Sequence, residues 1–186
     1  MVGVLALHGD VVEHMTILKG MGAQACEVRT VDDVRRVDRL IIPGGESTVM
    51  SKLLWEDGLA KEIQTRARSG ALAIYGTCAG AILLAENVVG DHPVRTLGLM
   101  DIEVRRNAYG TQSDSFEATL KVKGMTKSLS VAFIRAPVIT RVGKNADVLA
   151  RHEGRDVLVR QGRMLAGTFH PEVRGQTEIH KMFLKW

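Results

Sequence analysis

The sequence has few aromatic residues, few cysteines and no long hydrophobic run, and each shortage excludes a class of protein. Aromatic residues make up only 4% of the chain, and basic residues occur as scattered pairs, so a net charge of +4 does not indicate nucleic-acid binding. Two cysteines, Cys26 and Cys78, are too few for a secreted disulfide framework. The uncharged stretch 69–85 is shorter than the ~20 apolar residues of a membrane span, and glycines interrupt it. We therefore expect a cytoplasmic protein with reduced thiols and without a nucleic-acid or membrane partner.

Length and composition predict one globular domain. The 186 residues, 45% hydrophobic and 25% charged, are close to the averages of globular proteins, and single domains usually have ~100–200 residues. Because no linker, repeat or low-complexity segment divides the chain, we expect a single domain over 1–186. Asp10 and Glu13 closely follow the first apolar run without a basic leader, so we expect that run to be a strand and not a signal peptide.

The order of apolar segments predicts an α/β fold. In the first half, strand-length runs (2–7, 25–29, 39–42 and 71–75) alternate with helical patterns (11–21, 47–55, 59–68 and 79–86). This alternation predicts a mostly parallel central sheet flanked by helices on both faces. The second half is richer in predicted strands (98–104, 116–122, 131–135, 147–151, 156–160 and 164–168) and ends in a helix at 176–185, which indicates antiparallel additions. Asp10 and Ser47 are the expected N-caps of their helices.

A glycine-flanked cysteine lies between a predicted strand and a predicted helix. The pattern Gly76-x-Cys78-x-Gly80 is typical of a nucleophile elbow, in which a sharp turn exposes the nucleophile at the carboxyl end of a strand. The following helix would direct its first N–H groups, including that of Ala79, toward the sulfur and toward a developing oxyanion. The alternative is that Cys78 is only a small buried core residue, as we expect Cys26 to be.

A histidine and a carboxylate follow the last predicted strand. A cysteine nucleophile needs a base within hydrogen-bond reach and a group that orients the base. His170 is followed by Pro171 and Glu172, at the sheet edge where Cys78 is expected, so His170 and Glu172 are the candidate base and orienting carboxylate. The other histidines are expected to be uninvolved: His14 and His180 on helices, His92 and His152 in polar loops. His8, at the end of the first strand, stays open.

A Pro-Gly-Gly turn ends the third predicted strand. Pro43-Gly44-Gly45 can direct backbone N–H groups toward an anion, and it precedes Glu46 and Ser47. Beside an elbow nucleophile on a neighbouring strand, this turn is the candidate second oxyanion donor and substrate cradle.

Together these three motifs resemble the class I (triad) glutamine amidotransferases, which have a flavodoxin-like fold. Further segments, among them Arg105-Arg106-Asn107, Asp114-Ser115-Phe116-Glu117 and Phe133-Ile134-Arg135-Ala136-Pro137, resemble one branch, the glutaminase subunits of two-component pyridoxal 5′-phosphate synthases. The resemblance covers nearly the whole chain.

The resemblance implies hydrolysis of L-glutamine to L-glutamate and ammonia, and transfer of the ammonia to a separate synthase subunit. That partner makes pyridoxal 5′-phosphate from a pentose phosphate and a triose phosphate. The implied site, which needs no metal or cofactor, has three parts: the triad Cys78, His170 and Glu172; glutamine contacts from Gly45, Glu46, Ser47, Arg106, Ile134 and Arg135; and an oxyanion hole from Gly44, Gly45 and Ala79.

One residue departs from the family pattern, and three other functions stay open. The family usually has Gln at the position of His8, in a region that faces the synthase subunit, so His8 bears on docking and not on the triad. The first alternative is the glutaminase of another amidotransferase, such as that of histidine biosynthesis. The second is a cysteine hydrolase or stress-protein relative, in which His typically follows the elbow cysteine, whereas this chain has Ala79. The third is a catalytically idle interaction module.

Overall fold

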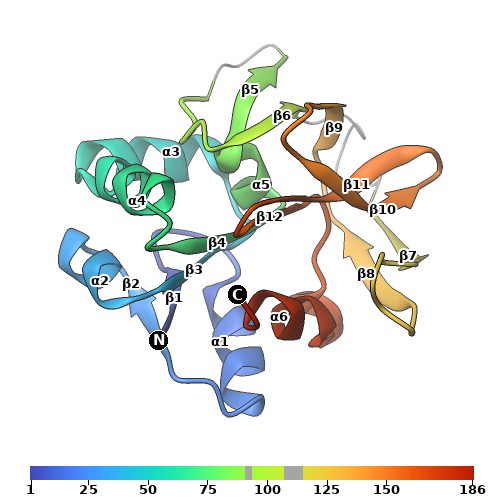
Figure 1. The fold of residues 1–186 in the computed structure, drawn as a ribbon, viewed down its shortest axis with the longest axis horizontal. Coiled ribbons are helices and arrows are strands. Elements are labelled where there is room, and N and C mark those ends of the chain that lie inside the picture. Colours follow the sequence, from blue (N-terminus) through green and yellow to red (C-terminus); the bar gives the residue numbers. More distant parts are fainter. Residues whose placement is uncertain (91–93, 107–114) are drawn as a thin grey trace.

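The computed structural model describes residues 1–90, 94–106 and 115–186, and a large sheet with helices on both faces organises them (Figure 1). Ten of the described strands form this sheet in the order β2-β1-β3-β4-β12-β11-β9-β6-β5, with β10 paired to β11. The strands are β1 (Val2–Leu5), β2 (Ala25–Val28), β3 (Arg39–Ile42), β4 (Ala73–Thr77), β5 (Ala85–Val89), β6 (Met100–Arg105), β9 (Val138–Val142), β10 (Asp147–His152), β11 (Arg155–Gln161) and β12 (Met164–Gly167).

The sheet has a parallel half and a largely antiparallel half, which confirms the predicted fold class. The strands β2, β1, β3, β4 and β12 pair parallel, whereas β11 is antiparallel to its neighbours β12, β9 and β10. The edge pair β5–β6 is again parallel. A separate antiparallel ribbon consists of β7 (Phe116–Leu120) and β8 (Leu129–Phe133).

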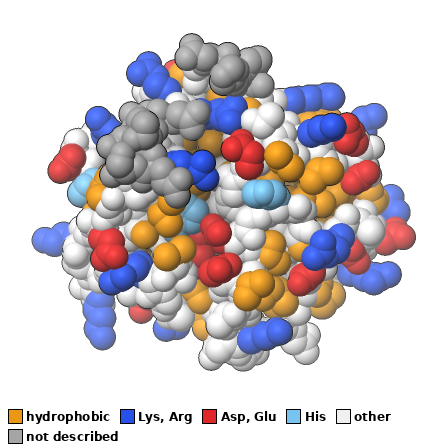
Figure 2. Space-filling view, turned by 180° about the vertical axis from the view of Figure 1, so that it is seen from behind, with side chains coloured by type: hydrophobic (Ala, Val, Ile, Leu, Met, Phe, Trp, Pro, Cys, Tyr) orange, Lys and Arg blue, Asp and Glu red, His pale blue; other side chains and the backbone are white. Residues whose placement is uncertain are grey.

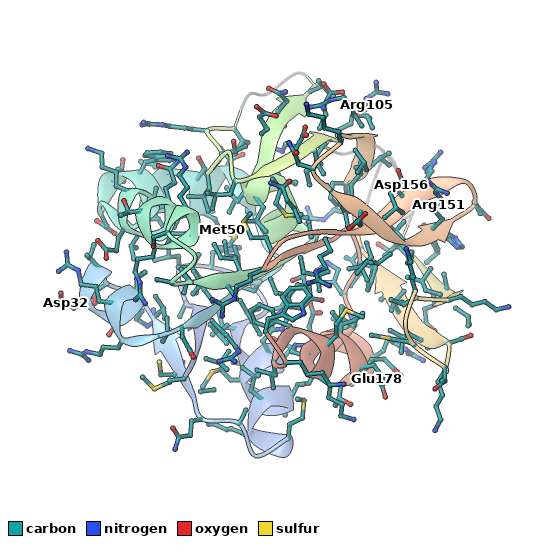
Figure 3. All side chains as sticks on the ribbon, viewed as in Figure 1. Asp32, Met50, Arg105, Arg151, Asp156 and Glu178 are labelled. Carbon is teal, nitrogen blue, oxygen red and sulfur yellow. The ribbon has the colours of Figure 1, made fainter. Side chains whose placement is uncertain are left out.

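Two hydrophobic layers cover the two faces of the sheet. Because successive side chains of a strand point to opposite faces, Leu40 and Ile42 of β3 belong to one layer and Ile41 to the other. The first layer contains α2 (Val31–Arg36), α3 (Ser47–Glu56), α4 (Leu59–Arg68) and α5 (Ala79–Leu84). The second contains α1 (Val11–Gly20), α6 (Glu178–Phe183) and the β7–β8 ribbon. Figure 3 shows Met50 of α3, a fully buried side chain of the first layer.

Several local predictions need correction. The predicted helix 79–86 ends at Leu84, and the chain continues as β5, an edge strand whose apolar residues extended the helical pattern. Helix α2 and strand β9 were not predicted. Glu46, not Ser47, is the N-cap of α3 and accepts a hydrogen bond from the Thr48 N–H. Asp10 occupies the N-cap position of α1, but its side chain makes no capping bond.

The candidate residues follow four adjacent strands. Asp10 comes after β1, the Gly44–Gly45 turn after β3, Cys78 after β4 and His170 after β12, and these strands are neighbours in the sheet. All four strands are parallel, so their carboxyl ends meet at one edge, where open α/β sheets bind ligands. No helix among the described residues is long and apolar enough to cross a membrane.

Candidate active site

Cys78 lies on a strained turn between β4 and α5, as the glycine pattern predicted. Its φ of 49° is in the left-handed region that non-glycine residues rarely adopt. Its N–H donates to the Gly167 carbonyl at 2.8 Å, which ties the turn to β12. A Cβ on Gly76 would lie 2.5 Å from the carbonyl carbon of Gly80, and a Cβ on Gly80 would lie 2.1 Å from the Ile42 oxygen. Both glycines are therefore needed for the backbone to pack this closely.

The backbone of His170 is fixed by a bridge to the β7–β8 ribbon. Its N–H donates to the Ala132 carbonyl at 2.7 Å, and its carbonyl accepts from the Ala132 N–H at 3.3 Å. The side chain is buried but lines the same pocket as Cys78. The sequence predicted that His170 follows a strand, but it held no sign of this bridge between distant segments.

Two carboxylates contact the same ring nitrogen of His170. Glu172 Oε1 lies 2.8 Å from Nδ1, as predicted for an orienting group, and Asp10 Oδ2 lies 3.1 Å from it. Because both carboxylates lie at Nδ1, Nε2 is the nitrogen left for the Cys78 thiol. The sequence placed Asp10 only as a helix cap, so its presence here was missed.

The charges of this cluster favour an imidazolium. Burial lowers the pKa of His170, but hydrogen bonds with Asp10, Cys78 and Glu172 outweigh burial and raise it to about 12. The hydrogen bond with His170 lowers the pKa of Asp10. Burial raises the pKa of Glu172, although the hydrogen bond with His170 opposes this shift. The geometry can therefore hold a proton on His170 beside the sulfur.

The pocket in front of Cys78 is lined by most of the predicted substrate residues. Its lining consists of Asp10, Gly45, Glu46, Ser47, Cys78, Ala79, Ile82, Arg106, Ile134, Arg135 and His170. Gly44 lies just behind this lining, since a Cβ there would meet the His170 ring at 2.3 Å. His8, beside the same turn, accepts a hydrogen bond from the Glu46 N–H at 3.2 Å.

The two pocket arginines differ in their surroundings. Arg106 is largely buried, and its Nη2 contacts Thr48 Oγ1 at 3.0 Å and Glu46 Oε1 at 3.3 Å. Arg135 is exposed and has a φ of 45°. The carbonyl of half-buried Ile134 accepts from the Cys78 thiol across 3.9 Å. The pocket thus offers two cations and a backbone acceptor close to Cys78.

Two further histidines lie behind Glu172, where the sequence placed only helix residues. The fully buried His14 ring contacts His180 Nε2 at 2.9 Å through Nδ1 and Thr77 Oγ1 at 3.3 Å through Nε2. Its Nε2 is also 3.6 Å from Glu172 Oε1. Burial lowers the pKa of His14 well below its ordinary value and that of His180 to about 4, so both rings stay neutral near pH 7.

The remaining candidates lie away from the triad. His152 ends β10 and stacks on Phe116 and Phe133, so its predicted place in a polar loop was wrong. Cys26 is half-buried against the first layer, near its predicted place in the core. His92 and two residues of the family motifs, Asn107 and Asp114, lie outside the described residues.

A metal ion has one geometric candidate site among the described residues. Ligand atoms of Asp10, His170 and Glu172 lie within 4.8 Å of one another. In the structure, however, both carboxylates already engage His170 Nδ1, so the same atoms serve the imidazole.

Comparisons with known proteins agree with this fold and identify a family. The sequence matches the SNO glutamine amidotransferase family over residues 4–186. It is 49% identical to "Pyridoxal 5'-phosphate synthase subunit PdxT" of Mycolicibacterium vanbaalenii, over 98% of this chain and 95% of that protein. The PdxT subunit of Thermus thermophilus is 48% identical, over 99% and 96%.

Solved structures give the same result. A crystal structure described as a glutamine amidotransferase matches with a TM-score of 0.94 at 47% identity, over 99% of this chain and 97% of that one. The structure of PurLQS from Thermotoga maritima matches with a TM-score of 0.68 at 17% identity, over 99% and 96%, which is a likeness of fold alone. Fold and relatives thus define the chain as a glutamine amidotransferase. Within this class, it belongs to the SNO glutamine amidotransferase family.

Proposed function

We propose that this chain is the glutaminase subunit of a pyridoxal 5′-phosphate synthase, and that residues 1–186 act as one catalytic domain. It hydrolyses L-glutamine to L-glutamate and ammonia, and a separate synthase subunit uses the ammonia with a pentose phosphate and a triose phosphate. The observation that supports this most is the 49% identity to a PdxT subunit over nearly the full length of both chains. A cytoplasmic location fits this function, because the catalytic thiol stays reduced there.

The proposed reaction proceeds through a thioester. The Cys78 thiolate attacks the side-chain carboxamide carbon of glutamine, and a tetrahedral oxyanion forms. The N–H groups of the Gly44–Gly45 turn and of Ala79 stabilise the oxyanion. His170 donates its proton to the departing ammonia, and the γ-glutamyl thioester remains. His170 then takes a proton from water, the hydroxide attacks the thioester carbon, and the carbon–sulfur bond breaks, so that glutamate is released and the Cys78 thiolate and protonated His170 are restored.

The remaining pocket residues are assigned to substrate binding. Glutamine carries an α-carboxylate and an α-ammonium group, so its recognition requires charges of both signs. Arg106 and Arg135 are the cations of the pocket, and Glu46 is the carboxylate held by Arg106. Gly45, Ser47 and Ile134 complete the proposed contacts with glutamine through the turn and the backbone.

Glutamate release from glutamine tests the proposed nucleophile. We expect weak activity of the isolated chain, a marked rise with the synthase subunit, and no activity in Cys78→Ala. Cys26→Ala is the matched control, because Cys26 is the second free thiol and lies in β2, away from the pocket. Unchanged turnover in Cys78→Ala would exclude Cys78 as the nucleophile.

A pull-down experiment tests the partner. The chain should retain the pyridoxal 5′-phosphate synthase subunit, and it should not retain the ammonia-accepting subunit of histidine biosynthesis. Binding only to the second of these would favour the alternative amidotransferase and contradict the proposed pathway.

A further inference from the structure

We propose that Asp10 is a positioning residue that shares the catalytic His170 with Glu172 and couples this imidazole to the Gly44–Gly45 turn. This inference rests on the proposed glutaminase function. The known logic of a triad needs one orienting carboxylate, and here two carboxylate oxygens lie 2.8 and 3.1 Å from Nδ1. Since Nδ1 carries a single hydrogen, Asp10 and Glu172 share one N–H donor.

The two carboxylates differ in exposure, which suits them to different tasks. The Glu172 side chain is fully buried, whereas that of Asp10 is 33% exposed and lines the substrate pocket. The pKa of Asp10 is lowered, mainly by its hydrogen bond with His170, and that of Glu172 is raised by burial. Asp10 is therefore the readily ionised partner of the imidazolium, and Glu172 is the rigid one.

The side chain of Asp10 contacts His170 and does not cap helix α1, which Asp10 precedes. Asp is among the preferred residues at an N-cap, where its side chain usually accepts hydrogen bonds from the first free N–H groups of the helix and stabilises it. Asp10 occupies this position before α1 but makes no such bond. A residue that forgoes a local stabilising bond for a contact in the pocket is typical of a functional site.

The backbone of Asp10 contacts the turn that is proposed to bind the oxyanion. Its N–H donates to the Gly44 carbonyl at 3.2 Å. A Cβ added to Gly44 would lie 2.7 Å from Asp10 Oδ2 and 2.3 Å from His170 Cε1, so the turn, the carboxylate and the ring are in direct contact. A shift of the turn thus moves the Asp10 carboxylate relative to His170, which links oxyanion binding to the orientation of the base.

The first test measures the protonation of His170 without any activity. In the free chain with labelled histidines, NMR follows the His170 ring through a pH titration, with assignment from His170→Gln. Asp10→Asn keeps the size of the side chain and removes its charge, so the midpoint of His170 should fall by ~1 pH unit. Asp38→Asn is the matched control, because Asp38 is also ion-paired but precedes β3 at the opposite edge of the sheet. An unchanged midpoint in Asp10→Asn would overturn the proposal.

The second test uses the complex with the synthase subunit. The alkaline limb of the kcat/KM profile should move to lower pH in Asp10→Asn, and Asp10→Glu should restore part of the wild-type profile. In a cycle with Glu172→Gln, the double variant should lose more activity than the product of the two single losses, since each carboxylate covers for the other. Independent effects would contradict shared positioning. Absence of glutaminase activity in the wild-type complex would instead contradict the proposed function and leave the NMR result standing.

Discussion

His14 and His180 face each other across 2.9 Å, from Nδ1 to Nε2, in a buried pair behind the Glu172 carboxylate. Protonation of either ring is unfavourable, because burial removes the charged form from water and lowers the pKa of both histidines. Two neutral imidazoles are therefore buried behind the pocket, whereas hydrogen bonds with Asp10, Cys78 and Glu172 raise the pKa of the third imidazole, His170.

Acid should destabilise the fold through this pair. The unfolded chain binds protons on these histidines below about pH 6.5, whereas folded His180 stays neutral down to about pH 4. The contribution of this lowered pKa to the free energy of unfolding is therefore complete above about pH 6.5 and is lost as the pH falls. For His180 alone the loss between pH 7 and 5 is about 2 kcal/mol. His170 opposes part of this loss, mainly between about pH 7 and 6, because its raised pKa keeps the folded ring protonated whereas the unfolded ring takes up its proton as the pH falls through about 6.5. Below about pH 6 it adds little slope, since the ring is then protonated in both states.

Urea unfolding at pH 7 and pH 5 measures this loss, and His180→Gln should reduce it because glutamine does not titrate. An equal loss in wild type and His180→Gln would show that the pair does not control acid stability.

The close contact of Gly80 with β3 predicts an unusual effect of alanine. In a helix interior, Gly→Ala normally stabilises by up to ~1 kcal/mol. In α5, the new Cβ of Gly80→Ala would collide with the Ile42 carbonyl, so we expect a loss of about 2 kcal/mol and of most glutaminase activity. Gly20→Ala is the control, since Gly20 ends α1 and a Cβ there meets nothing within 4 Å. Thermal unfolding compares the two variants, and Gly80→Ala should have the lower Tm. Similar Tm values would show that a Cβ at position 80 does not collide with the Ile42 carbonyl.

Arg106 should affect the binding of glutamine more than its conversion. Replacing Arg106 by Gln removes a cation next to Glu46 and Thr48, and loss of a charged hydrogen bond corresponds to a rise in KM of ~10-fold or more. Arg105→Gln is the matched control, because this neighbour is exposed at the end of β6 and does not line the pocket (Figure 3). Steady-state kinetics of the complex with the synthase subunit measure KM for glutamine in both variants. An unchanged KM in Arg106→Gln would show that Arg106 does not bind the substrate.

Basic and acidic side chains are mixed on the surface of the protein. Figure 2 shows basic side chains spread around the edge of one face, with acidic side chains between them. The small basic excess of the composition is therefore not gathered into one stripe on this face, and arginines such as Arg106 and Arg135 account for part of it at the pocket.

Local patterns predicted the parts of the site that one segment defines. The elbow at Cys78 and the strand before His170 follow from glycine spacing and from short apolar runs, and the structure has both. Two strands were harder to predict, β5 at the edge of the sheet and β9 between β11 and β6, because both have few fully buried residues and thus no clear pattern.

Contacts between distant segments could not be predicted in this way. His14 and His180 are 166 positions apart and meet only because α1 and α6 cover the same face of the sheet. Asp10 was interpreted as a cap because residue type and position favour one, and only the return of the chain at His170 gives its carboxylate another partner. Pairings of this kind depend on the order of strands, which periodicity does not determine.

The bridge between His170 and Ala132 means that Cys78, the proposed nucleophile, and His170, its proposed base, are held by different parts of the fold. Cys78 is held by the large sheet through Gly167, whereas the main chain of His170 is also held by the β7–β8 ribbon. An ion pair between Arg174 and Glu117 at 2.9 Å ties the segment after Glu172 to the same ribbon. A ligand or partner that displaces the β7–β8 ribbon would therefore move His170. The distance between the His170 ring and the Cys78 sulfur would then change, while Cys78 itself stays in place.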